Sequence, residues 1–383
     1  MSKVFIEEST LSAIGNAIRE KTGKSDLIGP LNMAAEISSI TTGGSGEEFE
    51  IPEITGDGDY MFANNGWNWF IEQFGNKIQT KDLIGAANMF YYSTRLENIP
   101  FDINFKPTSS DHLCNNMFAD CHKLTNVPKV NNAKPSGAQK MFQTCYLIQE
   151  VPDDFCDTWD WSYIETATST STRTGNNMFG YCYSLRSFPM EILSHDNQNL
   201  TSYSSTIYYG LFTYDYALDE VINLPVHYRD KGITSNMFSS AFDYCSRLKN
   251  LTFAVQEDGT PYTAKWKSQT IDLSKGIGWA SYVSNILNYN SGITADKQVT
   301  DDATYEALKN DPDWWTINQI YSRYNHDSAV ATLNSLPDTS AYGTNTIKFK
   351  GTNGSSTIGG AINTLTQEEI AVATAKGWTV TLV

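Results

Sequence analysis

The feature that most constrains this chain is a short motif, Met-Phe-x-x-Cys-x-x-Leu-x-x-Val-Pro, which recurs along its middle. Units 1 to 6 begin at Met89, Met117, Met141, Met178, Leu211 and Ala241. With that first residue as position 0, position 1 is always Phe, position 4 is Cys in four units, position 7 is Leu or Ile, and position 10 is apolar. Successive units start 28, 24, 37, 33 and 30 residues apart, so a fixed core alternates with loops of varied length.

Positions 0, 1, 4 and 7 have helical spacing, which predicts a short helical or 3₁₀ turn with one apolar face inward. Position 10 begins an extended stretch, and the Pro that follows it in four units cannot continue a helix. Such a unit cannot bury its apolar face alone, so neighbouring units must stack, and the expected fold class is a mixed α/β solenoid. The predicted repeat core comprises Phe90, Leu96, Phe118, Cys121, Leu124, Phe142, Cys145, Phe179, Cys182, Leu185, Phe212, Leu218, Phe242, Cys245 and Leu248.

Four of the six cysteines share position 4, which predicts a ladder of small buried side chains. The alternative is a disulfide or zinc site, for which Cys114, Cys121 and His122 are close in sequence. No C-x-x-C pair is present, however, so we expect neither a metal nor another cofactor.

The repeat, over residues 84 to about 260, resembles the BspA-type leucine-rich repeat in its Met-Phe-x-x-Cys variety. That variety is found in bacterial surface proteins and in phage structural proteins. The resemblance implies a right-handed solenoid used for adhesion and recognition. Unit 5 departs from the pattern because it lacks the Cys and the Pro, and the insertions between units are unusually long.

Residues 1–40 predict a pair of amphipathic helices, the second restarting at Gly29-Pro30. Two such helices bury too little surface to be stable alone, so they must pack on the chain, on copies of it or on a larger assembly. The runs 11–23 and 33–40 resemble the N-terminal segment of many phage tail, fibre and minor structural proteins, which implies attachment to the virion. The predicted attachment residues are Leu11, Ile14, Ile18, Met33 and Ile37.

The rest of the chain divides by composition and pattern. Residues 41–50 are a Gly/Ser linker, 51–260 the leucine-rich-repeat solenoid with a degenerate first unit at Met61-Phe62, and 261–383 divergent repeats with a cap. In the last part we expect helices at 300–308 and 327–335 and a strand at 346–350. A capping box at 366–369 opens a further helix that stops at Gly377 before a final strand, and this ending resembles that of phage leucine-rich-repeat proteins.

The composition argues against several classes of partner. With 43 acidic and 27 basic residues the net charge is −16, which is unsuited to nucleic acid or an anionic membrane surface. We expect no membrane insertion and no signal peptide, because no long apolar stretch and no N-terminal h-region is visible. No catalytic motif is present, so we expect no enzymatic activity. Aromatic residues in the inserted loops are candidate binding residues, although they could equally fill gaps under the loops: Trp159, Trp161, Tyr163, Tyr203, Tyr208 and Tyr209.

Together these patterns predict a non-enzymatic bacteriophage virion structural protein, assembled in the host bacterial cytoplasm. Its N-terminus would attach to other virion proteins of the tail, baseplate or capsid. Its solenoid would be displayed toward a host-surface glycan or protein, or toward a virion protein, and virion symmetry favours a homo-oligomer. The alternatives are a bacterial cell-surface adhesin with leucine-rich repeats and a virion-associated polysaccharide depolymerase.

Overall fold

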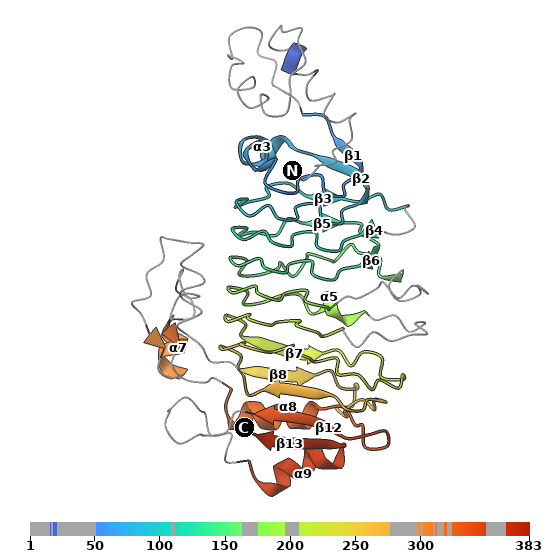
Figure 1. Ribbon diagram of the computed structural model, residues 1–383, viewed down its shortest axis with the longest axis vertical. Coiled ribbons are helices and arrows are strands. Elements are labelled where there is room, and N and C mark those ends of the chain that lie inside the picture. The colour runs from blue at the N-terminus through green and yellow to red at the C-terminus, as the bar shows by residue number, and fades with distance from the viewer. Residues whose placement is uncertain are drawn as a thin grey trace.

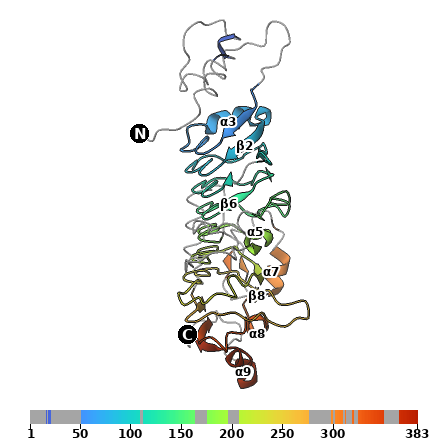
Figure 2. The same cartoon turned by 90° about the vertical axis from the view of Figure 1, so that its right-hand side faces the viewer.

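The described segments between residues 51 and 275 form coils that lie one above another along the long axis of the molecule (Figure 1; Figure 2). The computed structural model describes residues 16, 18–20, 51–108, 112–162, 175–195, 207–275, 298–299, 302–308, 311, 318–319, 324–349 and 365–383. Each coil has one side built of tight turns and one side that is extended. The repeat motif forms the turn side.

The turn side is not helical, so the predicted helical or 3₁₀ turn is wrong. Hydrogen bonds between residues three apart, such as Tyr91 N to Asn88 O (3.0 Å), close successive β-turns. Asn88 and Tyr92, at positions −1 and 3 of unit 1, have φ of 59° and 60°. A left-handed residue at every fourth position interrupts any right-handed helix. The same two positions have positive φ in the other units, at Asn116, Asp120, Lys140, Thr144, Asn177, Tyr181, Gly210, Tyr214, Ser240 and Tyr244.

Hydrogen bonds along the stack fix the register of the turns. The position 1 amide donates to the position 0 carbonyl of the next unit, as from Phe90 to Met117, from Phe118 to Met141 and from Phe142 to Met178, each at 2.9 Å. Amides at positions −1 and 3 donate to the next coil in the same way. The left-handed residues make this possible because they turn alternate amides along the stack axis.

The extended side carries short strands that pair only in parallel, as expected where each coil repeats the direction of the last. The pairs are β1 (Ile54–Asp57) with β2 (Thr80–Gly85), β3 (Ile103–Asn104) with β5 (Val130–Asn131), β4 (His112–Leu113) with β6 (Pro135–Gly137), and β7 (Glu220–Leu224) with β8 (Asn250–Phe253). Beside the stack, β10 (Gln298–Val299) pairs with β11 (Asn318–Gln319) next to α7 (Asp302–Leu308).

The C-terminal part continues the parallel pairing. β9 (Thr270–Leu273), β12 (Asn345–Phe349) and β13 (Trp378–Leu382) form one sheet in the order β13-β12-β9. Helix α8 (His326–Ser335) packs on β8, where Thr332 Oγ1 donates to the Leu251 carbonyl at 2.5 Å. Helix α9 (Gln367–Ala375) begins at the predicted capping box of Thr366 and Glu369 and is followed by Gly377 at φ 83°.

Toward the N-terminal end of the stack, α3 (Asn68–Phe74) and the 3₁₀ helix η1 (Gly75–Lys77) follow the turn at Met61-Phe62, which stacks on unit 1 as an atypical first coil. Of the predicted attachment residues, Ile18 is helical and fully buried. Leu11, Ile14, Met33 and Ile37 lie outside the described residues, as does the linker at 41–50. A short helix, α5 (Glu191–Ser194), follows the extended segment of unit 4.

The core is a set of ladders that run the length of the stack. Phenylalanine rings at position 1, from Phe62 to Phe242, lie with successive centroids 5.3 to 6.1 Å apart and nearly parallel planes. The predicted repeat-core residues are buried, except that Cys245 is partly exposed. Stacked aromatic rings add about 0.5–1.5 kcal/mol per pair beyond the area that they bury.

Candidate functional site: the opened junction between units 4 and 5

On the turn side, the coils of units 4 and 5 stack without interruption. The rings of Phe179 and Phe212 lie 5.7 Å apart at an interplanar angle of 4°. The amide of Phe179 donates to the Leu211 carbonyl at 3.1 Å, and that of Tyr181 donates to the Thr213 carbonyl at 2.7 Å. These contacts match those at the other coil junctions.

On the extended side, the same two coils separate. Ser187 of unit 4 pairs with Glu150 of unit 3, and β7 of unit 5 pairs with β8 of unit 6. Among these fully described segments, no backbone hydrogen bond joins 187–190 to 220–222. The parallel pairing is therefore interrupted at this junction.

A large side chain lies at the separation. Position 10 holds Ile, Val or Leu in the other five units and Phe188 in unit 4. The Phe188 ring lies 4.9 Å from that of Phe179 and 5.0 Å from that of Phe212, so it fills the space between the two coils behind the extended segments. Adjacent paired strands lie about 4.7–4.9 Å apart. The coils of units 2 and 3, with Val127 and Val151 at position 10, likewise share no backbone hydrogen bond there, so the ring of Phe188 accompanies the separation without being its general cause.

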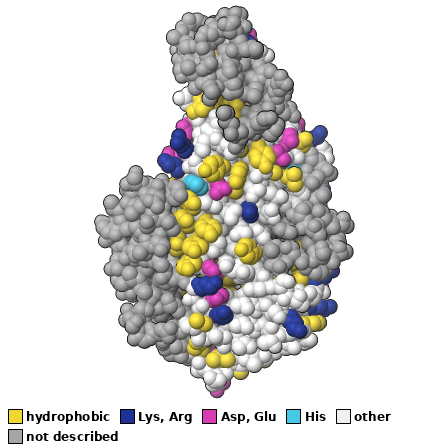
Figure 3. Space-filling view, viewed as in Figure 1, with side chains coloured by type: hydrophobic (Ala, Val, Ile, Leu, Met, Phe, Trp, Pro, Cys, Tyr) yellow, Lys and Arg dark blue, Asp and Glu magenta, His cyan; other side chains and the backbone are white. Residues whose placement is uncertain are grey.

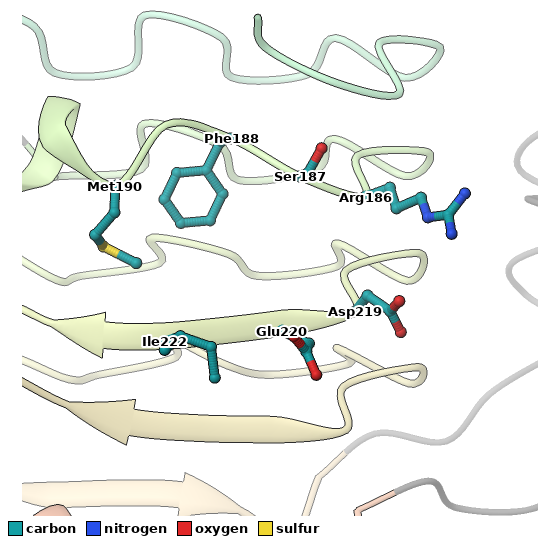
Figure 4. Close-up of a pocket in the computed structure, with 7 residues that line it drawn as sticks. All are labelled: Arg186, Ser187, Phe188, Met190, Asp219, Glu220 and Ile222. Carbon is teal, nitrogen blue, oxygen red and sulfur yellow. The ribbon is translucent and has the colours of Figure 1, made fainter. Parts of the chain in front are cut away.

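A hollow of about 300 Å³ lies where the segments separate. Figure 4 shows Phe188 and Met190 on the segment of unit 4 and Glu220 and Ile222 on β7, with the hollow between them. Arg186 and Asp219 lie at one end of it. The hollow thus combines apolar side chains with charged groups of both signs.

A second hollow, of about 320 Å³, shares Met190 with the first and continues past α5. Its lining includes Glu191, Asn223 and Arg229, and the guanidinium of Arg229 lies 4.4 Å above the ring of Tyr262. Hydrophobic side chains also gather on the face that Figure 3 shows, over the upper and middle coils. The two hollows form one groove across the extended side, which suits a ligand that crosses several coils.

Three of the six aromatic residues predicted to bind at the surface are buried. Trp159 and Trp161 are 7% exposed and Tyr208 is fully buried, so these three are not surface binding residues. Trp159 Nε1 donates to the Val130 carbonyl at 2.9 Å, and the Tyr208 hydroxyl donates to the Pro225 carbonyl. Tyr209 is 44% exposed. Tyr163 and Tyr203 lie outside the described residues.

The position of Tyr208 in its unit explains its burial. It occupies position −3, which is also buried in the other units, as at Ala86, Cys114 and Ala138. Extending the alignment three residues upstream would have found this. The rings of Trp159 and Trp161, after unit 3, lie 5.1 Å from each other, an arrangement common for buried aromatic side chains.

Two tyrosine ladders on the turn side lie at positions that the repeat motif leaves undefined. Tyr181, Tyr214 and Tyr244, all at position 3, stack at 4.9 and 4.5 Å. Tyr146, Tyr183 and Tyr216, at position 5, form the second ladder. Burial raises the pKa of the Tyr214 phenol above its usual value, with the charges of Tyr244 and Tyr181 as smaller causes.

The thiols of the position 4 ladder point into the stack. Burial raises the pKa values of Cys145 and Cys182 well above the usual thiol range, so both remain protonated at neutral pH. Across the described residues, no three His, Cys, Asp or Glu side chains gather as a metal site would require. No helix in that part of the chain is long and apolar enough to cross a bilayer.

Comparison of the chain with protein-family models, with curated proteins and with solved structures found no match. The functional interpretation of the groove therefore depends on its geometry.

Proposed function

We propose that this protein is a non-enzymatic structural protein of a bacteriophage virion, attached through residues 1–40 and binding a partner through its coil stack. Two parts of this proposal come from the sequence: the solenoid of leucine-rich-repeat type and the pair of N-terminal helices. The interruption at the junction of units 4 and 5 carries the binding part.

The groove suits recognition by a surface rather than capture of a small molecule. It is shallow, crosses the extended side of three coils, and mixes apolar floor residues such as Ile222 with the charged groups of Arg186, Glu220 and Arg229. Protein-binding surfaces combine an apolar centre with a polar rim in this way. An extended segment of a partner could also lie along β7, since strand addition uses an unpaired side of a sheet.

Attachment is tested by deleting residues 1–40. We expect particles assembled with the shortened chain to lack it, whereas the full chain co-sediments with them. Normal incorporation of the shortened chain would refute the attachment part and would leave the groove untouched.

Binding is tested by Ile222→Lys, with Ile84→Lys as the matched control. Both side chains are exposed on strands, at 39% and 51%, but only Ile222 lines the groove. We expect Ile222→Lys to weaken sedimentation of the purified protein with host cells or with particles that lack it, while Ile84→Lys does not. Equal effects of the two substitutions would remove the groove from the proposal.

A further inference from the structure

Position 4 donates a hydrogen bond to the coil before it in five of the six units. In every case the acceptor is the carbonyl of the preceding position 1 phenylalanine. The donors are Ser93 to Phe62 (2.7 Å), Cys121 to Phe90 (3.1 Å), Cys145 to Phe118 (3.0 Å), Cys182 to Phe142 (3.0 Å) and Cys245 to Phe212 (3.1 Å). A proton on the position 4 side chain thus joins the neighbouring coils at these five junctions.

Unit 5 is the exception, because its position 4 residue is Asp215. The side chain is fully buried, and its Oδ1 accepts a hydrogen bond from the Cys182 amide at 2.8 Å. Its other oxygen, Oδ2, is buried and has no hydrogen-bond partner among the described residues. The register of the ladder assigns the carbonyl of Phe179 to this position, and a carboxylate cannot donate to it.

We propose that Asp215 carries a proton at neutral pH and that its Oδ2–H donates to the Phe179 carbonyl, so that units 4 and 5 are joined by a neutral carboxylic acid and separate when it ionises. The carboxyl then makes both hydrogen bonds of its site, one as acceptor and one as donor. At this junction the contact adds to the backbone bonds of the turn side, while the extended segments share none.

The surroundings of Asp215 favour the neutral form. Burial raises its pKa well above the ordinary value, and the bond from the Cys182 amide opposes this only in part. The titratable groups that face it are the thiols of Cys182 and Cys245. Beyond Cys245 lies the carboxylate of Asp243, which is paired with Lys275 at 2.9 Å. A buried carboxylate among such neighbours would lack a compensating charge.

The direction of the pH dependence follows from linkage. Because the folded protein holds this proton more tightly than the unfolded chain, the stabilisation is complete below the unfolded pKa of about 3.9 and is lost as the pH rises toward the folded value. In that window the equilibrium constant for opening rises about tenfold for each pH unit. The contact between units 4 and 5 should therefore weaken as the pH rises.

The test compares the wild type with Asp215→Asn, whose amide can make both hydrogen bonds without titrating, and with Asp215→Cys, which restores the common residue. Asp258→Asn, at an exposed carboxyl, is the control. Denaturant unfolding is followed from pH 6 to 9. The wild type and Asp258→Asn should lose stability with rising pH relative to Asp215→Asn and Asp215→Cys.

A direct readout is the infrared band of a protonated carboxylic acid. It should be present in the wild type at pH 7, shift on isotope labelling of aspartate and disappear in Asp215→Asn. Absence of the band, or an unchanged pH profile in Asp215→Asn, would overturn the proposal. If Asp215→Asn does not fold, the band in the labelled wild type decides alone.

Discussion

The ring of Phe188 lies 5.0 Å from the ring of Phe212, which places a side chain of the extended segment of unit 4 against the phenylalanine ladder of unit 5. At the neighbouring junction of units 5 and 6, position 10 holds Val221 and Leu251 and the strands pair directly. At these two junctions the larger side chain accompanies the break in pairing, whereas units 2 and 3 share no backbone hydrogen bond at position 10 although both carry Val.

Phe188→Val should allow the extended segments of units 4 and 5 to approach. The smaller side chain matches position 10 of the other units, so backbone pairing can extend across the junction and the hollow should shrink. Hydrogen exchange at the amides of 188–190 and 220–222 measures this, and we expect slower exchange than in the wild type. Unchanged exchange would show that the wedge is not the cause of the separation.

Truncating the phenylalanine ladder at its middle should destabilise the whole stack. Phe142 is fully buried, and its ring stacks between Phe118 at 5.4 Å and Phe179 at 5.5 Å. Phe142→Ala should lower the free energy of unfolding by about 3–5 kcal/mol, as for other buried aromatics. Tyr209→Ala, at an exposed ring, should change it by less than about 0.5 kcal/mol. Chemical denaturation of both variants measures the two changes in the free energy of unfolding.

The sequence predicts these ladders at some positions of the repeat and not at others. Phe, Cys and Leu at positions 1, 4 and 7 repeat with little change, so their burial followed from the pattern alone. The turn conformation did not, because the same apolar spacing fits a helix and a chain of β-turns. Asn88, Asn116 and Asn177 at position −1 are a signal for left-handed backbone, but Tyr92 and Tyr181 at position 3 are not.

The opened junction could not be predicted from the motif. Phe188 satisfies the requirement for an apolar residue at position 10, and only its packing between two coils reveals its effect. Likewise, Asp215 counts as a missing cysteine in an alignment, whereas in the structure it occupies the same buried place. Trp159 and Trp161 lie in an insertion for which the repeat gives no reference position.

The cysteine ladder predicts a difference between two small substitutions. Cys145→Ser keeps a donor to the Phe118 carbonyl, as Ser93 already does toward Phe62 at 2.7 Å. Cys145→Ala leaves that carbonyl only the Cys121 amide, at 3.2 Å, and should cost about 0.5–1.5 kcal/mol, the net contribution of one hydrogen bond. Thermal unfolding in the presence of reductant should rank the wild type and Cys145→Ser above Cys145→Ala. The reverse order would mean that the thiol contributes only by its apolar volume.

Lys376 should make the C-terminal part of the stack more stable in mild base. Its Nζ donates to the carbonyls of Leu333 and Asn334, at 2.9 and 2.5 Å, near the end of α8. Burial lowers its pKa to about 8, while the nearby Asp338 opposes the shift. Since the folded state releases this proton more readily than the unfolded chain, stability rises as the pH passes through about 8 toward the unfolded pKa.

This sign is opposite to that expected for Asp215, so the two contributions can be separated by substitution. Lys376→Met keeps the apolar stem and removes the titrating group. Measured from pH 7 to 10, its stability should lack the rise that Lys376 gives the wild type, while the loss due to Asp215 persists. Competitive amine acetylation at pH 8 gives a second measure of the Lys376 pKa. Only the neutral amine reacts, so the rate at Lys376 relative to other lysines depends on its neutral fraction and on its exposure. A wild-type profile identical to that of Lys376→Met would show that the amine is solvated and titrates at its ordinary pKa.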